Sequence, residues 1–212
     1  CVAAARLRPA RAVYARSLFR RTRTRSGGPD PDLRNEGHKT EAFVADDMQV
    51  VLGGTFDPVH DGHRALFTRA FELGDVTVGL TSDDLANQSR YRDRYVRPFE
   101  ERRADLREEL AGFAEEYGRD FEVRRLDSPT GIAVEPGFDV LIVSPETREG
   151  GERINEIREE RGLESLELEV VPHERAEDGG IISSTRITRG EIDEHGNLTP
   201  DAEPRRPPAE EQ

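Results

Sequence analysis

Strand and helix signals alternate along most of this chain, and that alternation limits the possible fold more than any other feature of the sequence. Short apolar runs are typical of buried strands, and apolar residues at helical spacing are typical of helices that pack on one face. Strands that alternate with helices indicate a parallel sheet. We therefore expect an α/β, Rossmann-like fold with a five-stranded parallel sheet and helices on both faces. The strands are expected at residues 48–52, 75–80, 121–126, 138–143 and 166–171, and the helices at 61–73, 98–117, 149–161 and 184–189, with a polar loop at 81–97.

Composition changes sharply at Met48, the single methionine of the 212-residue chain. Residues 1–29 hold eight arginines and no acidic residue, whereas residues 48–212 hold 21 arginines and 38 acidic residues. We interpret residues 1–47 as a disordered or non-native extension, residues 48–195 as the folded domain, and residues 196–212 as a disordered, acidic and proline-rich tail. An arginine-rich start without acids is also typical of transit peptides. Because the chain begins with Cys1, we favour translated upstream sequence without a role.

Composition also excludes several classes of function. The only cysteine is Cys1, so the folded domain has no residue for disulfides, thiolate zinc sites or cysteine nucleophiles. No apolar stretch approaches the roughly 18–20 residues that a membrane span needs, so we expect a soluble, cytoplasmic protein with no membrane partner. With 21 arginines against 38 acidic residues, residues 48–212 carry a net charge of −17, which argues against nucleic acid as a partner. An anionic ligand therefore has to be held by local groups.

The expected domain contains no lysine, because Lys39 is the only lysine of the chain. An acidic, lysine-free surface resembles proteins from salt-loving archaea, and we expect a halophilic source. A GC-rich coding sequence would also favour arginine over lysine, so both explanations stay open at this point.

A run rich in glycine and histidine, GGTFDPVHDGH at residues 53–63, follows the first expected strand. Two glycines at a strand end let the backbone come close to a ligand. His60 and His63 fall on one face of the first helical turn, whose free N–H groups and positive dipole end favour an anion such as a phosphate. In Rossmann-like domains, ligands lie at the carboxyl ends of the strands. The run is therefore predicted to hold a nucleotide's phosphates against two imidazoles.

A second signature, ISSTRI at residues 182–187, opens another expected helix about 120 residues later. The two together resemble the nucleotidyltransferase superfamily that shares the His-x-Gly-His motif. Further segments narrow the resemblance to the archaeal-type phosphopantetheine adenylyltransferases, over about residues 48–193. These segments are GLTSD (79–83), RPFEER (97–102), VSPET (143–147), INEIR (154–158) and SSTRI (183–187).

The resemblance implies adenylyl transfer from ATP to 4′-phosphopantetheine, which gives dephospho-coenzyme A and diphosphate. It also implies a requirement for Mg²⁺, which is expected on the ATP phosphates with no protein side chain as ligand. In such a reaction the acceptor phosphate attacks the α-phosphorus directly and no protein nucleophile is needed. The enzyme has to align two anions and stabilise charge on the α-phosphate oxygens.

The same triphosphate-binding motifs leave other functions open. Nicotinamide mononucleotide adenylyltransferase, FMN adenylyltransferase and glycerol-3-phosphate cytidylyltransferase all use them, so the choice of acceptor depends on the segments that follow the second and fourth expected strands. A different class is a nucleotide sensor that has kept the fold and lost catalysis. Both histidines and the complete second signature are present, which argues against the sensor. Oligomeric state cannot be derived from these motifs.

The catalytic residues are expected to be His63 and His60. The resemblance gives His63, the last histidine of its motif, the role of donating an N–H to the α-phosphate, with His60 next to it on the triphosphate side. Gly62 leaves space for the nucleotide. Asp57 is expected to hold its loop in place rather than to act as an acid or base.

ATP is expected to bind across both signatures. The three hydroxyls of the second signature, at the start of a helix, favour binding of the β- and γ-phosphates, although one serine would suffice as a cap. The arginine that follows is either a phosphate ligand or a surface residue. The expected ATP-binding residues are Gly53, Gly54, Thr55, Phe56, His60, Gly62, His63, Ser183, Ser184, Thr185 and Arg186.

The acceptor is expected at the ends of the first two strands. A dense arginine cluster follows the second strand, and in a very acidic domain it favours binding of the pantetheine phosphate or the diphosphate over a solvated surface role. Bacterial relatives use a lysine in this region, and which arginine replaces it stays open. The expected acceptor-binding residues are Thr55, Thr81, Ser82, Asp83, Arg90, Arg92, Arg94 and Arg97.

Overall fold

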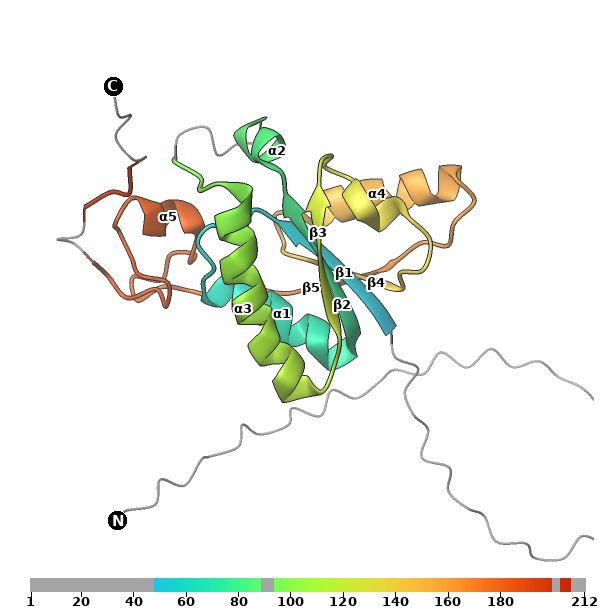
Figure 1. Ribbon diagram of the computed structural model, residues 1–212, viewed down its shortest axis with the longest axis horizontal. Helices are drawn as coiled ribbons and strands as arrows, with labels where there is room; N and C mark the ends of the chain where they lie inside the picture. Colours follow the sequence, from blue (N-terminus) through green and yellow to red (C-terminus); the bar gives the residue numbers. More distant parts are fainter. Residues whose placement is uncertain (1–47, 89–93, 200–202, 207–212) are drawn as a thin grey trace, which may run out of the picture. The chain divides into compact units, whose positions relative to one another are not determined.

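A computed structural model describes residues 48–88, 94–199 and 203–206 (Figure 1). Five strands form one sheet in the order β3-β2-β1-β4-β5, and every neighbouring pair is parallel. The α/β, Rossmann-like prediction is therefore confirmed. The strands are β1 (Met48–Gly54), β2 (Gly74–Thr81), β3 (Phe121–Leu126), β4 (Val140–Val143) and β5 (Glu167–Val170). The helices are α1 (Asp61–Leu73), α2 (Asp83–Gln88), α3 (Phe99–Tyr117), the 3₁₀ helix η1 (Gly131–Val134), α4 (Arg148–Glu160) and α5 (Ser184–Thr188).

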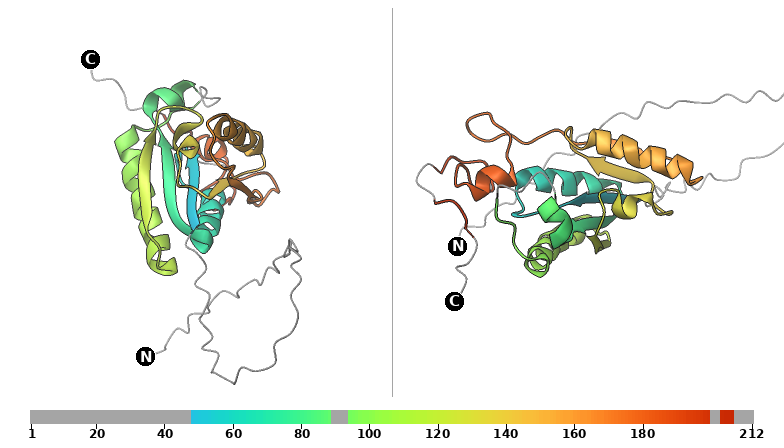
Figure 2. Two further views of the ribbon diagram at one scale, coloured as in Figure 1. Left: turned by 90° about the vertical axis from the view of Figure 1, so that its right-hand side faces the viewer. Right: turned by 90° about the horizontal axis from the view of Figure 1, so that it is seen from above.

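Alternate residues of the central strands point into two different hydrophobic layers. Val50 and Leu52 of β1 belong to a layer shared with α1 and α3, whereas Val51 packs in the layer beneath η1 and α4. This period of two is what a strand buried on both faces requires. In the right-hand view of Figure 2, α3 and α4 lie on opposite sides of the central strands. Helices therefore cover both faces, as the sequence predicts.

Strand order changes direction beside β1, which pairs with β2 on one side and with β4 on the other. In an open parallel sheet, such a switch point leaves a crevice at the carboxyl ends of the strands, because the chain leaves neighbouring strands toward opposite faces. The segments that follow β1, β2 and β4 all start at this edge. The fold thus brings the first predicted signature to the place where ligands bind.

Two short elements are absent from the sequence prediction. The expected loop at 81–97 contains α2, and η1 lies between β3 and β4. Helix α2 has six residues and buries only Ala86 among its own side chains, so it has no apolar periodicity to find. The fourth strand begins at Val140 rather than at residue 138. At its start, the carboxylate of Asp139 accepts a hydrogen bond from the Gln49 amide at 2.8 Å.

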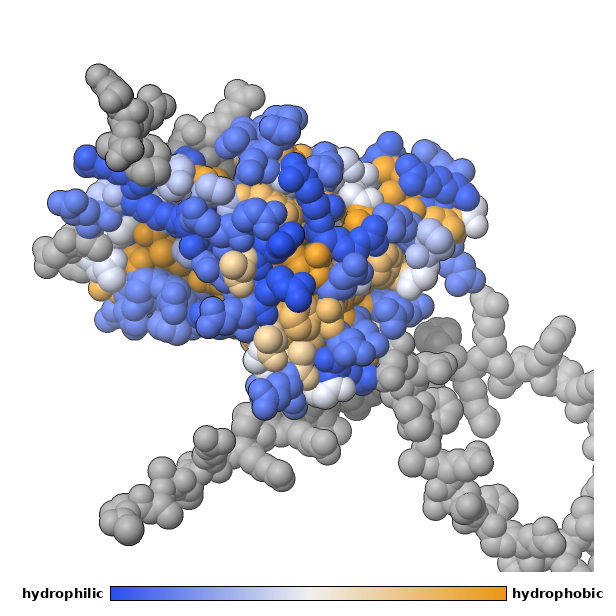
Figure 3. Space-filling model, in the orientation of Figure 1, coloured by the Kyte–Doolittle hydropathy of each residue, from blue (hydrophilic) through white to orange (hydrophobic). Residues whose placement is uncertain are grey.

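Hydrophilic residues cover most of the face that Figure 3 presents, in keeping with the charged composition. Among the described residues, no helix is both long enough and apolar enough to cross a membrane.

Candidate active site

The loop from Thr55 to His60 connects β1 to α1 and is built around a buried aromatic ring. Phe56 is 2% exposed and has a φ of 46°, a conformation that side-chain-bearing residues rarely adopt. Its ring centroid lies 4.9 Å from that of His63 and 5.4 Å from that of Phe67. A Cβ on Gly54 would lie 2.9 Å from Cζ of this ring, so Gly54 provides the room that Phe56 needs. Phe56, predicted only as an ATP-binding residue, therefore supports His63 by packing against its ring.

His60 and His63 lie against each other at the N-terminus of α1. Their ring centroids are 3.8 Å apart and the ring planes differ by 21°. Burial lowers the pKa of His60 to about 4, with a further contribution from Arg64. Burial also lowers the pKa of His63 well below its ordinary value, and His60 and Arg94 add to that effect. Both rings are therefore neutral at pH 7, each with one donor and one acceptor nitrogen.

The Nδ1 atoms of His60 and His63 are buried, and neither accepts nor donates a hydrogen bond within the described part of the chain. Buried polar atoms in proteins are nearly always paired, and exceptions at a crevice are frequently ligand positions. The pair therefore offers unused hydrogen-bonding capacity at the switch point of the sheet.

Gly62 brings the two signatures together. A Cβ at this position would lie 3.0 Å from Cε1 of His60 and 3.6 Å from the carbonyl oxygen of Ile182. The Ser184 hydroxyl donates to the Pro58 carbonyl at 3.2 Å, across 126 residues of sequence. Residues 53–63 and 182–187, predicted to form one site, are adjacent in space.

The second signature has clear structural contacts as well. Ser183 caps α5, since its hydroxyl oxygen accepts a hydrogen bond from the Arg186 amide at 3.4 Å. The Arg186 guanidinium is bound by Asp178 at 2.6 Å and by Glu191 at 3.0 Å. Thr185 lies in the first turn of the helix and is partly buried. The geometry thus favours the surface ion-pair interpretation of Arg186 over an open phosphate ligand.

Thr55 and Thr81, at the ends of the two central strands, contact each other through their hydroxyls at 3.2 Å. Ser82 is buried and caps α2, because its hydroxyl accepts from the Leu85 amide at 3.3 Å. Asp83, which begins α2, is paired with Arg102 at 2.9 Å. These predicted acceptor-binding residues therefore do gather at one edge of the sheet.

Arg102 is a site residue that sequence reasoning missed. It is fully buried beside the strand ends. Its guanidinium donates to the carbonyls of Thr55, Thr81 and Arg97 at 3.2, 2.9 and 2.8 Å. The segment RPFEER contains it, but only its charge is visible there, since most of its partners are backbone atoms. It ties the ends of β1 and β2 to the start of α3.

Asp57 is a fully buried carboxylate that holds the loop, as predicted. It accepts from the Arg97 amide at 2.7 Å and from Nε of Arg97 at 2.8 Å. Burial alone would raise the pKa of this carboxyl, but the hydrogen bonds from Arg97 and the charges of Arg205 and Arg97 hold the pKa of Asp57 below its usual range.

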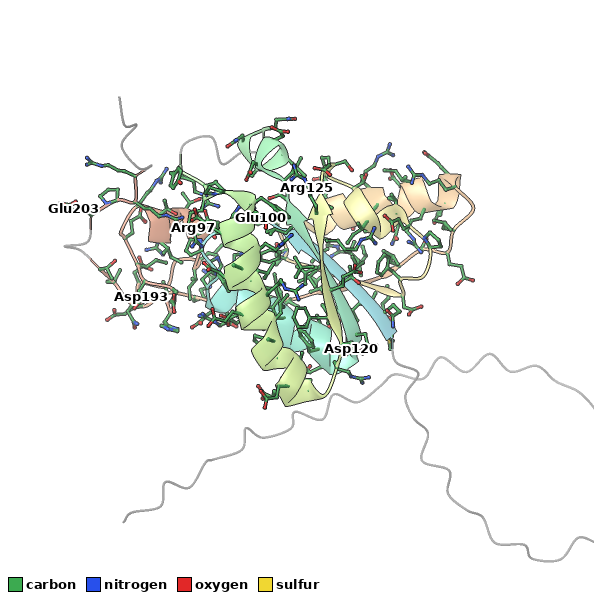
Figure 4. All side chains as sticks on the ribbon, viewed as in Figure 1. Arg97, Glu100, Asp120, Arg125, Asp193 and Glu203 are labelled. Carbon is green, nitrogen blue, oxygen red and sulfur yellow. The ribbon has the colours of Figure 1, made fainter. Side chains whose placement is uncertain are left out.

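Within the predicted arginine cluster, Arg94 and Arg97 both point at the loop. Arg94 donates to the carbonyl of Asp57 and reaches the Thr188 hydroxyl at 3.5 Å. Arg97 also pairs with Asp105 of α3 at 2.6 Å, and it lies between α3 and α5 in Figure 4. Arg90 and Arg92 lie outside the described residues.

Arg205 is a second residue that sequence reasoning missed, because it falls in the segment predicted to be a disordered tail. Its guanidinium contacts an Asp57 carboxylate oxygen at 3.1 and 3.2 Å. Its backbone amide donates to the Thr188 carbonyl at 2.8 Å. Residues 203–206 therefore approach both the loop and α5.

A cleft of about 500 Å³ lies beside the loop. Its two arginines are already paired with carboxylates of the lining, Arg64 with Glu109 and Arg97 with Asp105. Because carboxylates outnumber guanidinium groups, this cleft does not suit a triphosphate. The lining is Pro58, Val59, Arg64, Arg97, Asp105, Glu108, Glu109 and Glu194.

Comparison with known proteins places this geometry in a family. Residues 51–190 match the family described as cytidylyltransferase-like. The chain is 44% identical over 153 residues to the phosphopantetheine adenylyltransferase of Methanosarcina acetivorans, which covers 71% of this chain and 95% of the relative. It is 42% identical to the Archaeoglobus fulgidus protein of the same name, covering 71% of this chain and 99% of that one.

The chain belongs to the phosphopantetheine adenylyltransferase family.

Two solved structures have a similar fold. An Archaeoglobus fulgidus protein of unknown function is 36% identical and superimposes with a TM-score of 0.52, covering 64% of this chain and all of that one. Tyrosyl-tRNA synthetase from the same organism, at 15% identity and a TM-score of 0.50 over 68% of this chain and 60% of its own, shares the fold alone. The 42–44% identity to relatives of that name confirms the predicted resemblance to phosphopantetheine adenylyltransferases.

Proposed function

We propose that this chain transfers the adenylyl group of ATP to 4′-phosphopantetheine and releases diphosphate and dephospho-coenzyme A. The observation that carries the proposal is the meeting of two signatures around a neutral histidine pair, in a chain 44% identical to phosphopantetheine adenylyltransferases. A cytoplasmic location is part of this proposal.

The chemistry is a direct displacement at the α-phosphorus. An oxygen of the acceptor phosphate forms a bond to that phosphorus while the bond to the bridging oxygen of the diphosphate breaks. His63 donates an N–H to a non-bridging α-phosphate oxygen. His60, next to it, donates an N–H to a triphosphate oxygen. Because both rings are neutral, they stabilise growing charge by hydrogen bonding without transferring a proton.

The rest of the ATP site comes from the backbone and from hydroxyls. Gly53 and Gly54 let the nucleotide approach the end of β1, and Gly62 keeps the first turn of α1 open. The hydroxyls and amides around Ser183–Thr185 serve the β- and γ-phosphates. For Ser184, binding a phosphate means exchanging its present bond to the Pro58 carbonyl.

The acceptor lies at the ends of β1 and β2. Thr55, whose hydroxyl meets that of Thr81, and the Phe56 amide face the incoming phosphate. Arg94, which donates to the Asp57 carbonyl, supplies positive charge beside the loop, whereas the guanidinium of Arg97 is already paired with Asp57 and Asp105. Ser82 and Asp83 line the same edge.

Mg²⁺ enters with ATP. The described residues contain no group of three or more histidine, cysteine, aspartate or glutamate side chains that could hold a metal ion. Mg²⁺ prefers oxygen ligands and commonly binds through substrate phosphates and water, so the nucleotide itself is the fitting ligand. When bound, the ion would neutralise charge on the departing diphosphate.

An acceptor panel tests the function. Purified protein with ATP and Mg²⁺ is expected to release diphosphate only when 4′-phosphopantetheine is added. Equal turnover with nicotinamide mononucleotide, FMN, or glycerol 3-phosphate and CTP would reject this acceptor. Tight ATP binding without turnover on any acceptor would favour a nucleotide sensor.

Substituting His63 tests the mechanism. His63→Ala is expected to lower kcat by roughly 10²–10³-fold, because one preorganised donor to the transition state is lost. The Kd for ATP, measured by calorimetry, should change far less. His173→Ala is the matched control and should leave both values near wild type. A His63 variant that loses ATP affinity while keeping kcat would contradict a transition-state role.

A further inference from the structure

Three arginines converge on Asp57, a residue of the loop between β1 and α1: two come from the segment just before α3 and one from the C-terminal part of the chain. Arg97 binds the carboxylate through its backbone amide and its Nε, Arg94 binds the carbonyl of the same residue, and Arg205 binds the carboxylate from the other end of the chain. The Asp57 side chain has no exposure to solvent. A carboxylate in this position depends on its partners to stay charged and fixed.

Two contacts other than the one with Asp57 fix the position of Arg205. Its guanidinium carbon lies 5.5 Å from the ring centroid of Tyr95, a distance typical of cation–π contact. Its amide donates to the carbonyl of Thr188 at 2.8 Å, which anchors the backbone on α5. One residue thus connects the loop, the segment around Tyr95 and the helix of the second signature.

We propose that Arg205 is a positioning residue for adenylyl transfer, and this inference rests on the function proposed above. The loop carries Phe56, whose ring supports His63, and it ends at His60. Fixing Asp57 therefore fixes the loop whose Phe56 ring packs against His63 and whose last residue is His60.

Two readouts test this proposal on the full chain. Arg205→Ala is expected to lower kcat by roughly tenfold while KM for ATP changes by less than about threefold, since misplacing reacting groups reduces the chemical step. Hydrogen–deuterium exchange in peptides covering residues 55–60 should be faster than in the wild type. Arg206→Ala, which removes the same charge at the exposed neighbouring position, is the matched control and should behave as wild type.

Arg205→Lys keeps the charge and should recover part of both readouts. The proposal is overturned if Arg205→Ala leaves kcat and loop exchange within twofold of the wild type, or if kcat falls with no change in exchange. A lysine variant as impaired as alanine in both readouts would also reject the ion-pair account. If the wild type does not adenylate 4′-phosphopantetheine at all, the proposed function fails, and the exchange data alone still decide whether Arg205 holds the loop.

Discussion

At the level of single residues, the proposed chemistry depends on two neutral histidines at the start of α1. Their rings are desolvated by each other and by Phe56, and the arginines nearby oppose protonation. A charged imidazole would pair with a phosphate more strongly in the ground state. Neutral rings instead reserve their donors for the charge that develops during transfer. The low pKa values are therefore part of the proposed mechanism.

The same pKa values predict how stability depends on pH. His60 has a folded pKa of about 4 against 6.5 for the unfolded chain, so unfolded protein binds a proton that folded protein excludes. Stability is then fully present above pH 6.5 and is lost as pH falls toward 4, by roughly 3 kcal/mol for His60 alone. Urea unfolding at pH 7, 6, 5 and 4.5 measures this slope.

Matched variants test whether His60 and His63 cause this pH dependence of stability. Replacing both His60 and His63 by glutamine should flatten the decline between pH 7 and 4.5, while His173→Gln should keep it. The Asp57 carboxylate contributes to stability at a different pH, because its pKa is lower in the folded protein than in the unfolded chain. Its contribution is fully present above about pH 3.9 and is lost as the pH falls through the folded-state pKa. A wild-type protein equally stable at pH 7 and 4.5 would show that the imidazoles are not buried neutral groups.

At the scale of elements, the edge of the sheet is assembled around Arg102. This α3 residue is fully buried. It donates hydrogen bonds to carbonyls at the ends of β1 and β2 and just before α3. Its ion pair with Asp83 secures the start of α2. The strand ends that present Thr55 and Thr81 are thus linked by one side chain.

Arg102→Met is expected to reduce the free energy of unfolding by about 3 kcal/mol or more, because one buried and two partly buried carbonyls lose their donor. Chemical denaturation with matched m-values checks this value. Arg103→Met is the control, since Arg103 is 48% exposed and its pair with Glu100 is worth at most about 1 kcal/mol. Equal losses for the two variants would mean that Arg102 is not a structural hub.

Arg102 and Arg205 also show where sequence reasoning stops. The strands and long helices repeat their apolar residues at fixed periods, and the structure places all five strands and α1, α3, α4 and α5 close to where they are predicted. The two signatures were recognisable because each combines glycine, histidine or hydroxyl residues at a strand or helix end. An arginine whose partners are backbone carbonyls, or an aspartate 148 residues away, has no local pattern to reveal it.

At the scale of the whole molecule, the main feature is the excess of negative charge in residues 48–212. Residues 48–212 hold 21 arginines against 38 acidic residues, and many of the arginines are paired at the surface, as Arg153 is with Glu156. Such exposed pairs contribute little each. The unpaired excess of negative charge repels itself in the folded state, and this repulsion is long-range at low salt.

Raising KCl from 0.1 M to 2 M is therefore expected to raise the melting temperature, by roughly 5 °C for a domain of this size. Most of the gain should come below 1 M, because the screening length has already fallen to about 3 Å at that concentration. Scanning calorimetry at several KCl concentrations, with sorbitol as an uncharged control, measures the effect. A melting temperature that falls with KCl would contradict the repulsion argument.

The contact between Arg205 and Asp57 has a practical consequence for making shorter versions of the protein. A fragment designed from sequence patterns would stop at residue 195 and discard the guanidinium that reaches Asp57 in the loop between β1 and α1. Fragments intended for crystallisation or assay should extend at least through residue 206. Affinity tags are better fused ahead of Met48, because β1 starts at the edge of the sheet opposite the histidine pair.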